Sequence, residues 1–377
     1  MEAADIQNSL GLLRAKRGLG AAQLANTVGI SRQTVYAIEA GTYVPNTAVS
    51  LKLARALDVT VEEIFQIEPE PRVPDDIVDA VVLGDIDAMV PGQSLRLCSV
   101  GGHTVAVVPE PGGLGLPPSD AVLLTPIRGA KLHSDAKVQI LNEEWKMPNR
   151  ILISGCDPSV SILAHSLQKQ GFELVIAYEN SSRSLELLQD KVVHIAGTHL
   201  SEKATGKTDL LPITKMFGRN SVVVISYAVW QEGLVTAQGN PKKISGISDL
   251  KRRDIRIANR EPGAGCRRLL DDMLHKQDLA GSQVRGYDRV IVGHLPAARM
   301  VGSGEVDCCI STEAVARALG LEFIPLVQKP YHLVIRRTQL NLPPIQALID
   351  TLGRSSFRRE VELSTGYMMR AAGDPVL

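Results

Sequence analysis

The chain has 377 residues, a length that corresponds to two or three domains of ~150 residues each. Hydrophobic residues make up 44% and charged residues 22%, which excludes a globally disordered chain. Lysine and arginine total 41, as do aspartate and glutamate, so the net charge is zero. This balance excludes a uniformly basic nucleic-acid coat and an acidic tail protein, and any contact with nucleic acid must be local.

No run approaches the ~18 consecutive apolar residues of a membrane span. The N-terminal segment carries Glu2 and Asp5 where a secretory signal needs positive charge followed by an apolar run. We therefore expect a cytoplasmic protein without a membrane partner. The cysteines form no C-x-x-C pair, so we expect free, mostly buried thiols, no metal site and no cofactor; they are Cys98, Cys156, Cys266, Cys308 and Cys309.

The order of predicted elements indicates a multidomain chain. Short helices come first, then an acidic, proline-containing linker, then short β-type runs separated by Gly- and Pro-rich turns. In the last zone apolar strands alternate with helical patterns, as in a parallel sheet covered by helices on both faces. The expected zones are a helical domain at 1–68, a linker at 69–76, a β-rich connecting segment at 77–148 and an α/β domain at 149–377.

Within the first zone, the segment 21–40 predicts two helices joined by a tight turn. Gly29 can adopt the left-handed conformation that ends the first of them, and Ser31 can cap the second by accepting from the amide of Thr34. Three further helices are expected at about 6–17, 48–57 and 61–66. The spacing is that of a helix-turn-helix within a five-helix bundle.

The segments LLRAKRGL (12–19), QLANTVGISRQTVYAIEAGTYVPN (23–46) and LKLARALDVTVEEIF (51–65) resemble the Cro/phage-repressor (XRE) family of DNA-binding domains. Gly20 departs from the family, which usually has Ser or Thr there as a helix cap. The resemblance implies that the second helix of the pair enters the major groove, where Gln33 can pair with adenine and Arg32 with guanine or phosphate. The expected DNA-contacting residues are Ser31, Arg32, Gln33, Thr34, Tyr36, Thr42, Tyr43 and Asn46.

The charge of this domain is modest. Residues 1–57 carry six basic and three acidic side chains, which suits one half-site but not tight binding by a monomer. We therefore expect a homodimer on double-stranded operator DNA. The alternative is a helical head that contacts protein.

Three loops of the last zone follow predicted strands and open helices. They are SGCDPSV (154–160), ENSSRSL (179–185) and AGTHLSE (196–202), and a glycine-containing loop, NREPGAG (259–265), follows later. In open α/β sheets ligands lie beyond the carboxyl ends of strands, where helix N-termini offer unpaired amides to an anion. Each loop alone is weak evidence, since Ser and Asn also cap helices.

The motifs GCDPSV, VHIAGTHL, GNPKKISGISDL, RIANREPGAG and GSGEVDCCIST resemble the periplasmic-binding-protein-like superfamily of type II topology, closest to its molybdate- and tungstate-type domains. The resemblance implies a first lobe at about 149–230 and 312–377, with a second lobe at about 231–311. It also implies a small ligand between them, held by Ser154, Asp157, Ser159, Asn180, Ser182, Thr198, His199, Arg260, Gly263, Gly265, Cys266, Ser311 and Thr312.

These features together predict a ligand-responsive transcriptional regulator that senses a small anion, a molybdate- or tungstate-type oxyanion or a related metabolite. Relatives are expected to place Ser or Thr near the Gly-rich loop, whereas Ala264 and Cys266 supply no hydroxyl here, which leaves the ligand open. No motif of a nucleophile elbow, zinc protease or P-loop is present, so we expect no enzyme. The alternative is a binding module or an enzyme linked to molybdenum-cofactor metabolism.

Overall fold

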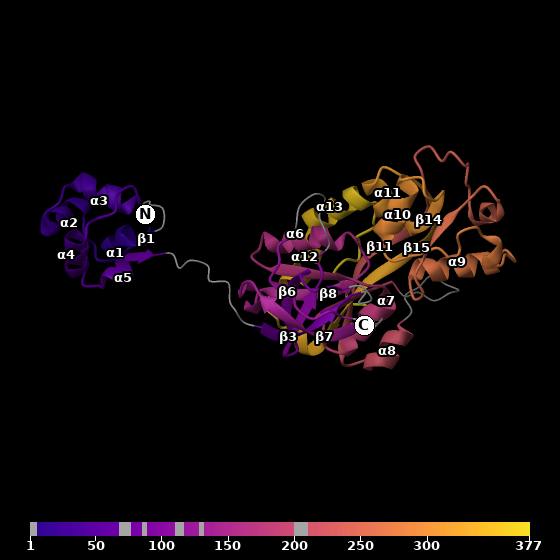
Figure 1. Cartoon of the computed structure of the whole chain (residues 1–377), viewed down its shortest axis with the longest axis horizontal. Helices are drawn as coiled ribbons and strands as arrows, with labels where there is room; N and C mark the ends of the chain where they lie inside the picture. Colours follow the sequence, from indigo (N-terminus) through magenta and orange to yellow (C-terminus); the bar gives the residue numbers. More distant parts are fainter. Residues whose placement is uncertain (1–5, 68–76, 85–88, 110–116, 128–131, 200–209) are drawn as a thin grey trace. The chain divides into compact units, whose positions relative to one another are not determined.

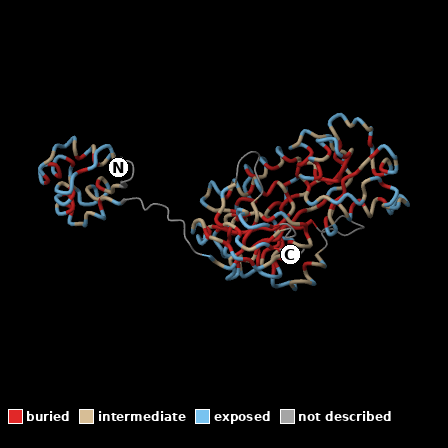
Figure 2. Tube along the Cα trace, in the orientation of Figure 1, coloured by how far each residue is buried: buried red, intermediate tan, exposed pale blue. Residues whose placement is uncertain are grey.

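The computed structural model describes residues 6–67, 77–84, 89–109, 117–127, 132–199 and 210–377. The chain divides into two compact units, Met1–Val73 and Pro74–Leu377 (Figure 1). Each unit has its own buried interior, drawn in red in Figure 2. This division separates the helical head from everything that follows it.

The first unit is a bundle of short helices closed by a small sheet. The helices are α1 (Leu10–Lys16), α2 (Ala21–Val28), α3 (Arg32–Glu39), α4 (Thr47–Leu57) and α5 (Val61–Ile64). Strand β1 (Ile6–Asn8) pairs antiparallel with β2 (Phe65–Ile67). The predicted bounds of the first helix (about 6–17) and the fifth helix (61–66) are therefore wrong at the ends where these strands form. Tertiary pairing of the two ends of the unit overrides the local helical pattern there.

The turn between α2 and α3 forms as its residues predict. Gly29 ends α2 with φ +78°, and the Ser31 side chain accepts from the amide nitrogen of Thr34 at 3.0 Å. Gly20 stands at the N-cap of α2 and offers no side-chain hydrogen bond. The apolar faces of α2, α3 and α4 meet in one core that includes Leu24, Val35 and Leu53, so the two helices of the motif are held rigidly.

The second unit begins with a closed five-stranded barrel. Its strands are β3 (Ile77–Leu83), β4 (Ser94–Val100), β5 (His103–Val107), β6 (Ala121–Leu123) and β7 (His133–Ile140), joined in the order β3-β5-β4-β6-β7. Alternate residues point into the barrel, where Leu95, Leu97 and Val138 are fully buried. The outer face packs against the α/β domain, because Val100 and Val105 share a core with Leu152 of that domain.

The α/β domain is built on one eight-stranded sheet with the strand order β13-β12-β14-β11-β15-β10-β8-β9. Its strands are β8 (Arg150–Gly155), β9 (Glu173–Tyr178), β10 (Ile195–Thr198), β11 (Val222–Thr236), β12 (Ile257–Arg260), β13 (Val290–Ile291), β14 (Cys308–Thr312) and β15 (Glu322–Arg336). Its helices are α6 (Val160–Gln168), α7 (Ser181–Gln189), α8 (Leu211–Phe217), α9 (Gly265–His275), α10 (His294–Gly302), α11 (Glu313–Ala318), α12 (Pro343–Gly353) and α13 (Ser355–Thr365). Short 3-10 helices lie at Glu144–Lys146, Ile247–Lys251, Gly281–Gln283 and Arg337–Gln339.

Two long antiparallel strands, β11 and β15, connect the two lobes. The first half of β11 pairs with the end of β15 in the first lobe, beside β10. The second half of β11 pairs with the start of β15 in the second lobe, beside β14. Helices cover both faces of the sheet in each lobe, with α6 opposite α7 in the first and α9 opposite α10 in the second (Figure 1).

The return of the chain to the first lobe comes later than expected. The first lobe is expected to resume at about 312, but the contacts of α11 are divided: Ala314 shares a core with Phe357 of the first lobe, whereas Val315 and Ala316 share one with the second lobe. The reason is that β15 starts in the second lobe and crosses back only along its own length. Long-range pairing of β11 with β15, which no local signal announces, therefore sets the lobe boundary.

Candidate functional site

The first candidate site is the exposed face of the helix-turn-helix, at the start of α3. Arg32 and Gln33 are exposed, as are Tyr36, Thr42 and Tyr43. The Arg32 guanidinium lies 5.3 Å from the centre of the Tyr36 ring and donates a 3.0 Å hydrogen bond to its hydroxyl. Within the described part of the chain Gln33 makes no side-chain hydrogen bond, so its amide is available to a partner.

Some residues expected at DNA also hold the domain together. Ser31 accepts from the Thr34 amide, and the Asn46 side chain caps α4 by accepting from the amide of Val49 at 3.0 Å. The Thr42 hydroxyl donates to the carbonyl of Ala37. Substitution of these residues would therefore mix a loss of stability with any loss of DNA contact.

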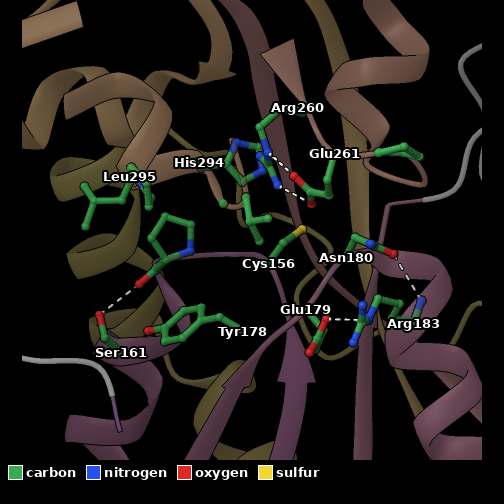
Figure 3. A pocket seen from close by; sticks show the side chains of 15 residues that line it. Cys156, Ser161, Tyr178, Glu179, Asn180, Arg183, Arg260, Glu261, His294 and Leu295 are labelled. Atoms are coloured by element: carbon green, nitrogen blue, oxygen red, sulfur yellow. Dashed lines mark hydrogen bonds and ion pairs between the residues drawn. The ribbon is translucent and has the colours of Figure 1, made fainter. Parts of the chain in front are cut away.

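The second candidate site is a cavity of about 490 Å³ between the two lobes. The first lobe contributes the ends of β8 and β9 and the starts of α6 and α7, and the second contributes the end of β12 and the start of α10 (Figure 3). The lining residues are Cys156, Pro158, Ser161, Tyr178, Glu179, Asn180, Arg183, Arg260, Glu261, Pro262, Val292, Gly293, His294, Leu295 and Pro296.

Two of the expected ligand residues, Asn180 and Arg260, line this cavity. The others lie outside its lining, and as ligand contacts they remain predictions. Eight of them are buried, Ser182 and Gly265 are half-buried and Gly263 is exposed; the buried ones are Ser154, Asp157, Ser159, Thr198, His199, Cys266, Ser311 and Thr312.

Several of the buried hydroxyls are already hydrogen-bonded within the domain. The Ser154 hydroxyl lies 3.0 Å from that of Ser184, and the Ser159 hydroxyl lies 2.9 Å from that of Tyr227. The Ser311 hydroxyl lies 3.3 Å from Nδ1 of His294. A ligand would have to replace these partners to be held by the same groups.

The N-terminus of α9, expected to face the ligand, contacts His199 instead. A Cβ on Gly265 would lie 1.9 Å from Cε1 of His199, so only glycine lets the two lobes approach this closely. The His199 ring also packs against Trp230, with ring centres 5.0 Å apart. Burial lowers the pKa of His199 to about 4, although the neighbouring Glu232 acts against this shift.

A buried ion pair lies at the crossing strands, and the sequence offered no signal for it. Glu232 on β11 is fully buried, and one of its carboxylate oxygens lies 2.9 Å from Nζ of Lys329 on β15. The other oxygen lies 3.5 Å from Nδ1 of His199. Burial alone would raise the pKa of Glu232, but the Lys329 ammonium is the main group that opposes it, and that pKa stays below its ordinary value.

Arg260 is the cation at the wall of the cavity. Its Nε and Nη2 donate to the two carboxylate oxygens of Glu261 at 2.8 and 2.9 Å. Only 3% of Arg260 is exposed, and its Nη1 has no hydrogen-bond partner among the described residues. Burial opposes the charge, yet Glu261 keeps the pKa of Arg260 above its ordinary value, so the guanidinium stays charged with donors to spare.

Sequence reasoning missed most of the cavity wall. Cys156 and Glu179 lie in two of the loops that follow predicted strands, but neither is a helix cap, so no local signal marks them as wall residues. The start of α10 was missed altogether. A Gly-His at 293–294 after a short apolar run is the only local signal for it.

Asp157, which follows β8 in the first lobe, should make the stability of the folded state depend on pH. Its carboxylate accepts from the Ser159 amide at 2.8 Å, and burial raises the pKa of the carboxyl from 3.8 to about 6. The stabilisation of the folded state by protonated Asp157 is therefore complete below pH 3.8, and it is lost as the pH rises through 6. Asp157→Asn is expected to raise the free energy of unfolding by about 1–3 kcal/mol at pH 8, measured by urea denaturation. At pH 5 the gain should shrink; an equal gain at both pH values would contradict the assignment.

Among the described residues no cluster of three His, Cys, Asp or Glu side chains could hold a metal ion. No helix in the same residues is both long and apolar enough to cross a bilayer. The cysteines are free, and all but Cys156 are buried, as expected from the sequence.

Comparison with known protein families decides the class of the chain. Residues 164–353 match the family model described as the PBP superfamily domain, and residues 10–64 match a helix-turn-helix model. The chain belongs to the PBP superfamily. The helix-turn-helix match agrees with the XRE-type resemblance of the first unit, so this PBP-superfamily chain carries a regulator-type DNA-binding head.

Two relatives of this PBP-superfamily chain come from one organism and cover different shares of it. The uncharacterized protein YvgK of Bacillus subtilis (strain 168) is 31% identical over 244 residues, 64% of this chain and 79% of YvgK. The uncharacterized HTH-type transcriptional regulator YgzD of the same organism is 42% identical over 65 residues, 17% of this chain and 98% of YgzD. Among solved structures, the sulfate-binding protein SubI from Mycobacterium tuberculosis H37Rv has 18% identity and a TM-score of 0.43, covering 57% of this chain and 85% of SubI.

Proposed function

We propose that the protein is a ligand-responsive transcriptional regulator that acts in the cytoplasm as a homodimer on operator DNA. One observation carries the proposal: a helix-turn-helix head with an unengaged Gln33 is joined to a two-lobed domain with a cavity between its lobes. Two recognition helices about 34 Å apart would read a pseudo-palindrome. Both modules are binding modules, which favours a regulator over an enzyme.

The proposed ligand is a small anion. Arg260 supplies a charged donor at the cavity, and α6, α7 and α10 begin at its walls, where helix N-termini favour negative charge. A tetrahedral oxyanion such as molybdate or tungstate is one form of this proposal, and a related anionic metabolite is the other. A ligand at a hundred times its dissociation constant stabilises the folded state by ~2.7 kcal/mol. A thermal-shift screen with molybdate, tungstate, sulfate and phosphate therefore tests the first form.

The link between the two modules follows from differential affinity. A ligand that prefers one arrangement of the lobes shifts the regulator toward that arrangement, with a coupling of typically ~1–3 kcal/mol. Operator affinity should therefore differ by roughly five- to 150-fold with and without ligand. Identical operator titrations at zero and saturating ligand would contradict the coupling.

Gln33 provides the direct test of DNA reading. Gln33→Ala is expected to lose ~1–3 kcal/mol of discrimination between the preferred base and its alternatives, because one bidentate contact is removed. The measurement is a gel-shift competition on promoter DNA upstream of the protein's own coding region, with single-base variants of each half-site. Gln23→Ala is the matched control, since Gln23 is an exposed glutamine on α2. Unchanged sequence preference in the Gln33 variant would show that α3 does not read bases.

A further inference from the structure

We infer that the cavity between the lobes takes an organic anion, with one acidic group at Arg260 and a largely apolar carbon body, rather than a bare tetrahedral oxyanion. The inference rests on the proposed sensor function and narrows its ligand. Four features of the cavity support it: its size, the donors at one end, the apolar walls and the state of the buried hydroxyls.

The size of the cavity exceeds what an oxyanion needs. Its volume of about 490 Å³ falls within the range of ~300–1,000 Å³ typical of sites for organic ligands. A tetrahedral oxyanion has only five heavy atoms, so it would leave most of the cavity to solvent.

Donors for one acidic group converge at the second-lobe end. The Arg260 Nη1 atom is buried without a partner among the described residues, while Glu261 holds the rest of the guanidinium in place. The nine-residue helix α10 begins at His294, and no side chain caps it. Figure 3 shows the His294 ring beside Arg260 on the cavity wall. A carboxylate or phosphate here would accept from Nη1 and from the free amides of the first turn.

His294 itself does not supply a second cation. Burial lowers its pKa well below the ordinary value, and the nearby Arg260 acts in the same direction. Its Nδ1 faces the Ser311 hydroxyl at 3.3 Å and the Cys266 sulfur at 3.9 Å. The positive charge at this end therefore comes from Arg260, and its ion pair with Glu261 already offsets that charge, which suits one acidic group better than a dianion alone.

The remaining walls are mostly apolar. Val292 and Leu295 from the second lobe face Tyr178 and Pro158 from the first. Val292 is 52% exposed and Tyr178 37% exposed, so both present apolar surface to the cavity that a carbon body would cover. The far side carries the Glu179–Arg183 ion pair at 2.9 Å, which a second polar group of the ligand could meet.

The hydroxyls suited to a bare oxyanion are not at the cavity. Ser154, Ser159 and Ser311 are buried and bonded to neighbours within the domain. The N-terminus of α9, another place for an oxyanion, is covered by His199. The donors without a partner among the described residues are instead the buried Nη1 of Arg260 and the first amides of α10, and the surface beside them is carbon.

The test is calorimetry on the full-length protein with matched probes. Phenyl phosphate and benzoate carry a ring and one acidic group, inorganic phosphate and molybdate carry no ring, and benzyl alcohol carries no charge. At least one ring-bearing anion should bind tenfold or more tightly than either inorganic anion, and benzyl alcohol should bind more weakly than that ring-bearing anion by the same factor. Equal or tighter binding of molybdate or inorganic phosphate, or binding of none of the probes, would overturn the inference.

Variants locate the site. Arg260→Gln should weaken the ring-bearing anion at least tenfold, whereas Arg252→Gln should not, since Arg252 pairs with Asp254 outside the cavity. Because Arg260 is buried and its variant can fail to fold, Val292→Asp provides a second test on an exposed wall residue. Val292→Asp should weaken binding of the anion at least tenfold, while Val290→Asp, at a similarly exposed residue outside the lining, should not. If neither variant differed from its control, the ligand would bind elsewhere.

Gel shifts with operator DNA on the same protein samples test the regulator proposal independently of this inference. In the absence of ligand, operator binding in a gel shift should require α3 and should not require the residues that line the cavity. If the protein prefers molybdate and its operator binding still responds to ligand, the organic-anion inference is wrong and the regulator proposal holds. Tight binding of a ring-bearing anion without any operator binding would do the reverse.

Discussion

Acidification from pH 7 to pH 5 is expected to unfold the second unit, with a transition centred near pH 5. Burial lowers the pKa of His194, His199 and His332 from 6.5 to about 4, and that of His294 further. These side chains stay neutral in the folded state and take up protons once exposed. Their contribution to stability is complete above pH 6.5 and is lost as the pH falls toward 4.

The expected loss is large because several groups act together. Each of the three histidines with a pKa near 4 removes about 2 kcal/mol of stability at pH 5, which for the set is comparable to the whole stability of a typical domain. Asp157 acts in the opposite direction, since its raised pKa favours the folded state on acidification, but it contributes only about 1 kcal/mol over this range.

Tryptophan fluorescence measures this transition selectively. The chain has two tryptophans, Trp145 and Trp230, and both are buried in the second unit. The first unit contains no histidine, so the mechanism does not act on it and helical circular dichroism from α1–α5 should persist. His194→Asn, whose side chain can still accept from the Leu152 amide, should move the midpoint to lower pH. A midpoint unchanged by this substitution, or fluorescence constant down to pH 4, would contradict the explanation.

Arg150→Ala is expected to destabilise the second unit by about 3–5 kcal/mol, because it leaves Arg96 as the one remaining cation among the described residues for two acids, Asp120 and Glu173, in a mostly buried cluster. Arg150 stands at the start of β8, and its Nη1 donates to Asp120 of the barrel at 2.7 Å and to the carbonyl of Leu97 at 2.8 Å. Its Nε lies 2.6 Å from Glu173 of β9. Asp120 is 2% exposed, so water cannot take the place of the guanidinium.

This substitution also tests whether the barrel and the α/β domain unfold together. Tryptophan emission reports on both parts, because Trp145 lies in the barrel core and Trp230 in the α/β core. If the two parts unfold together, urea denaturation of the wild type should show one transition. Arg317→Ala is the control: its pair with Glu313 is half-exposed, and such pairs contribute ~0–1 kcal/mol. A loss in the Arg150 variant no larger than in this control would show that the buried cluster does not hold the two parts together.

The helical head could be derived almost entirely from its own residues. Gly29 must take a left-handed conformation and Ser31 must cap the next helix whatever surrounds them, because both effects act within four residues. The strand that replaces the start of the expected first helix is the exception. It exists because β1 meets β2, whose residues lie nearly sixty positions further along the chain.

In the second unit the succession of short β-type runs and then alternating strands and helices could be predicted from the sequence, since these are local patterns, although strand β3 and helix α10 were not predicted. Closure of the barrel, the crossing of β11 and β15 and the wall of the cavity were decided by tertiary structure. Arg260 could be expected at a ligand from its loop, but its partner Glu261, its open Nη1 and the start of α10 opposite Tyr178 could not. The physical reason is the separation along the chain over which each effect acts. Helix caps and hydrophobic periodicity involve residues within about one helical turn, whereas a cleft brings together side chains more than a hundred residues apart.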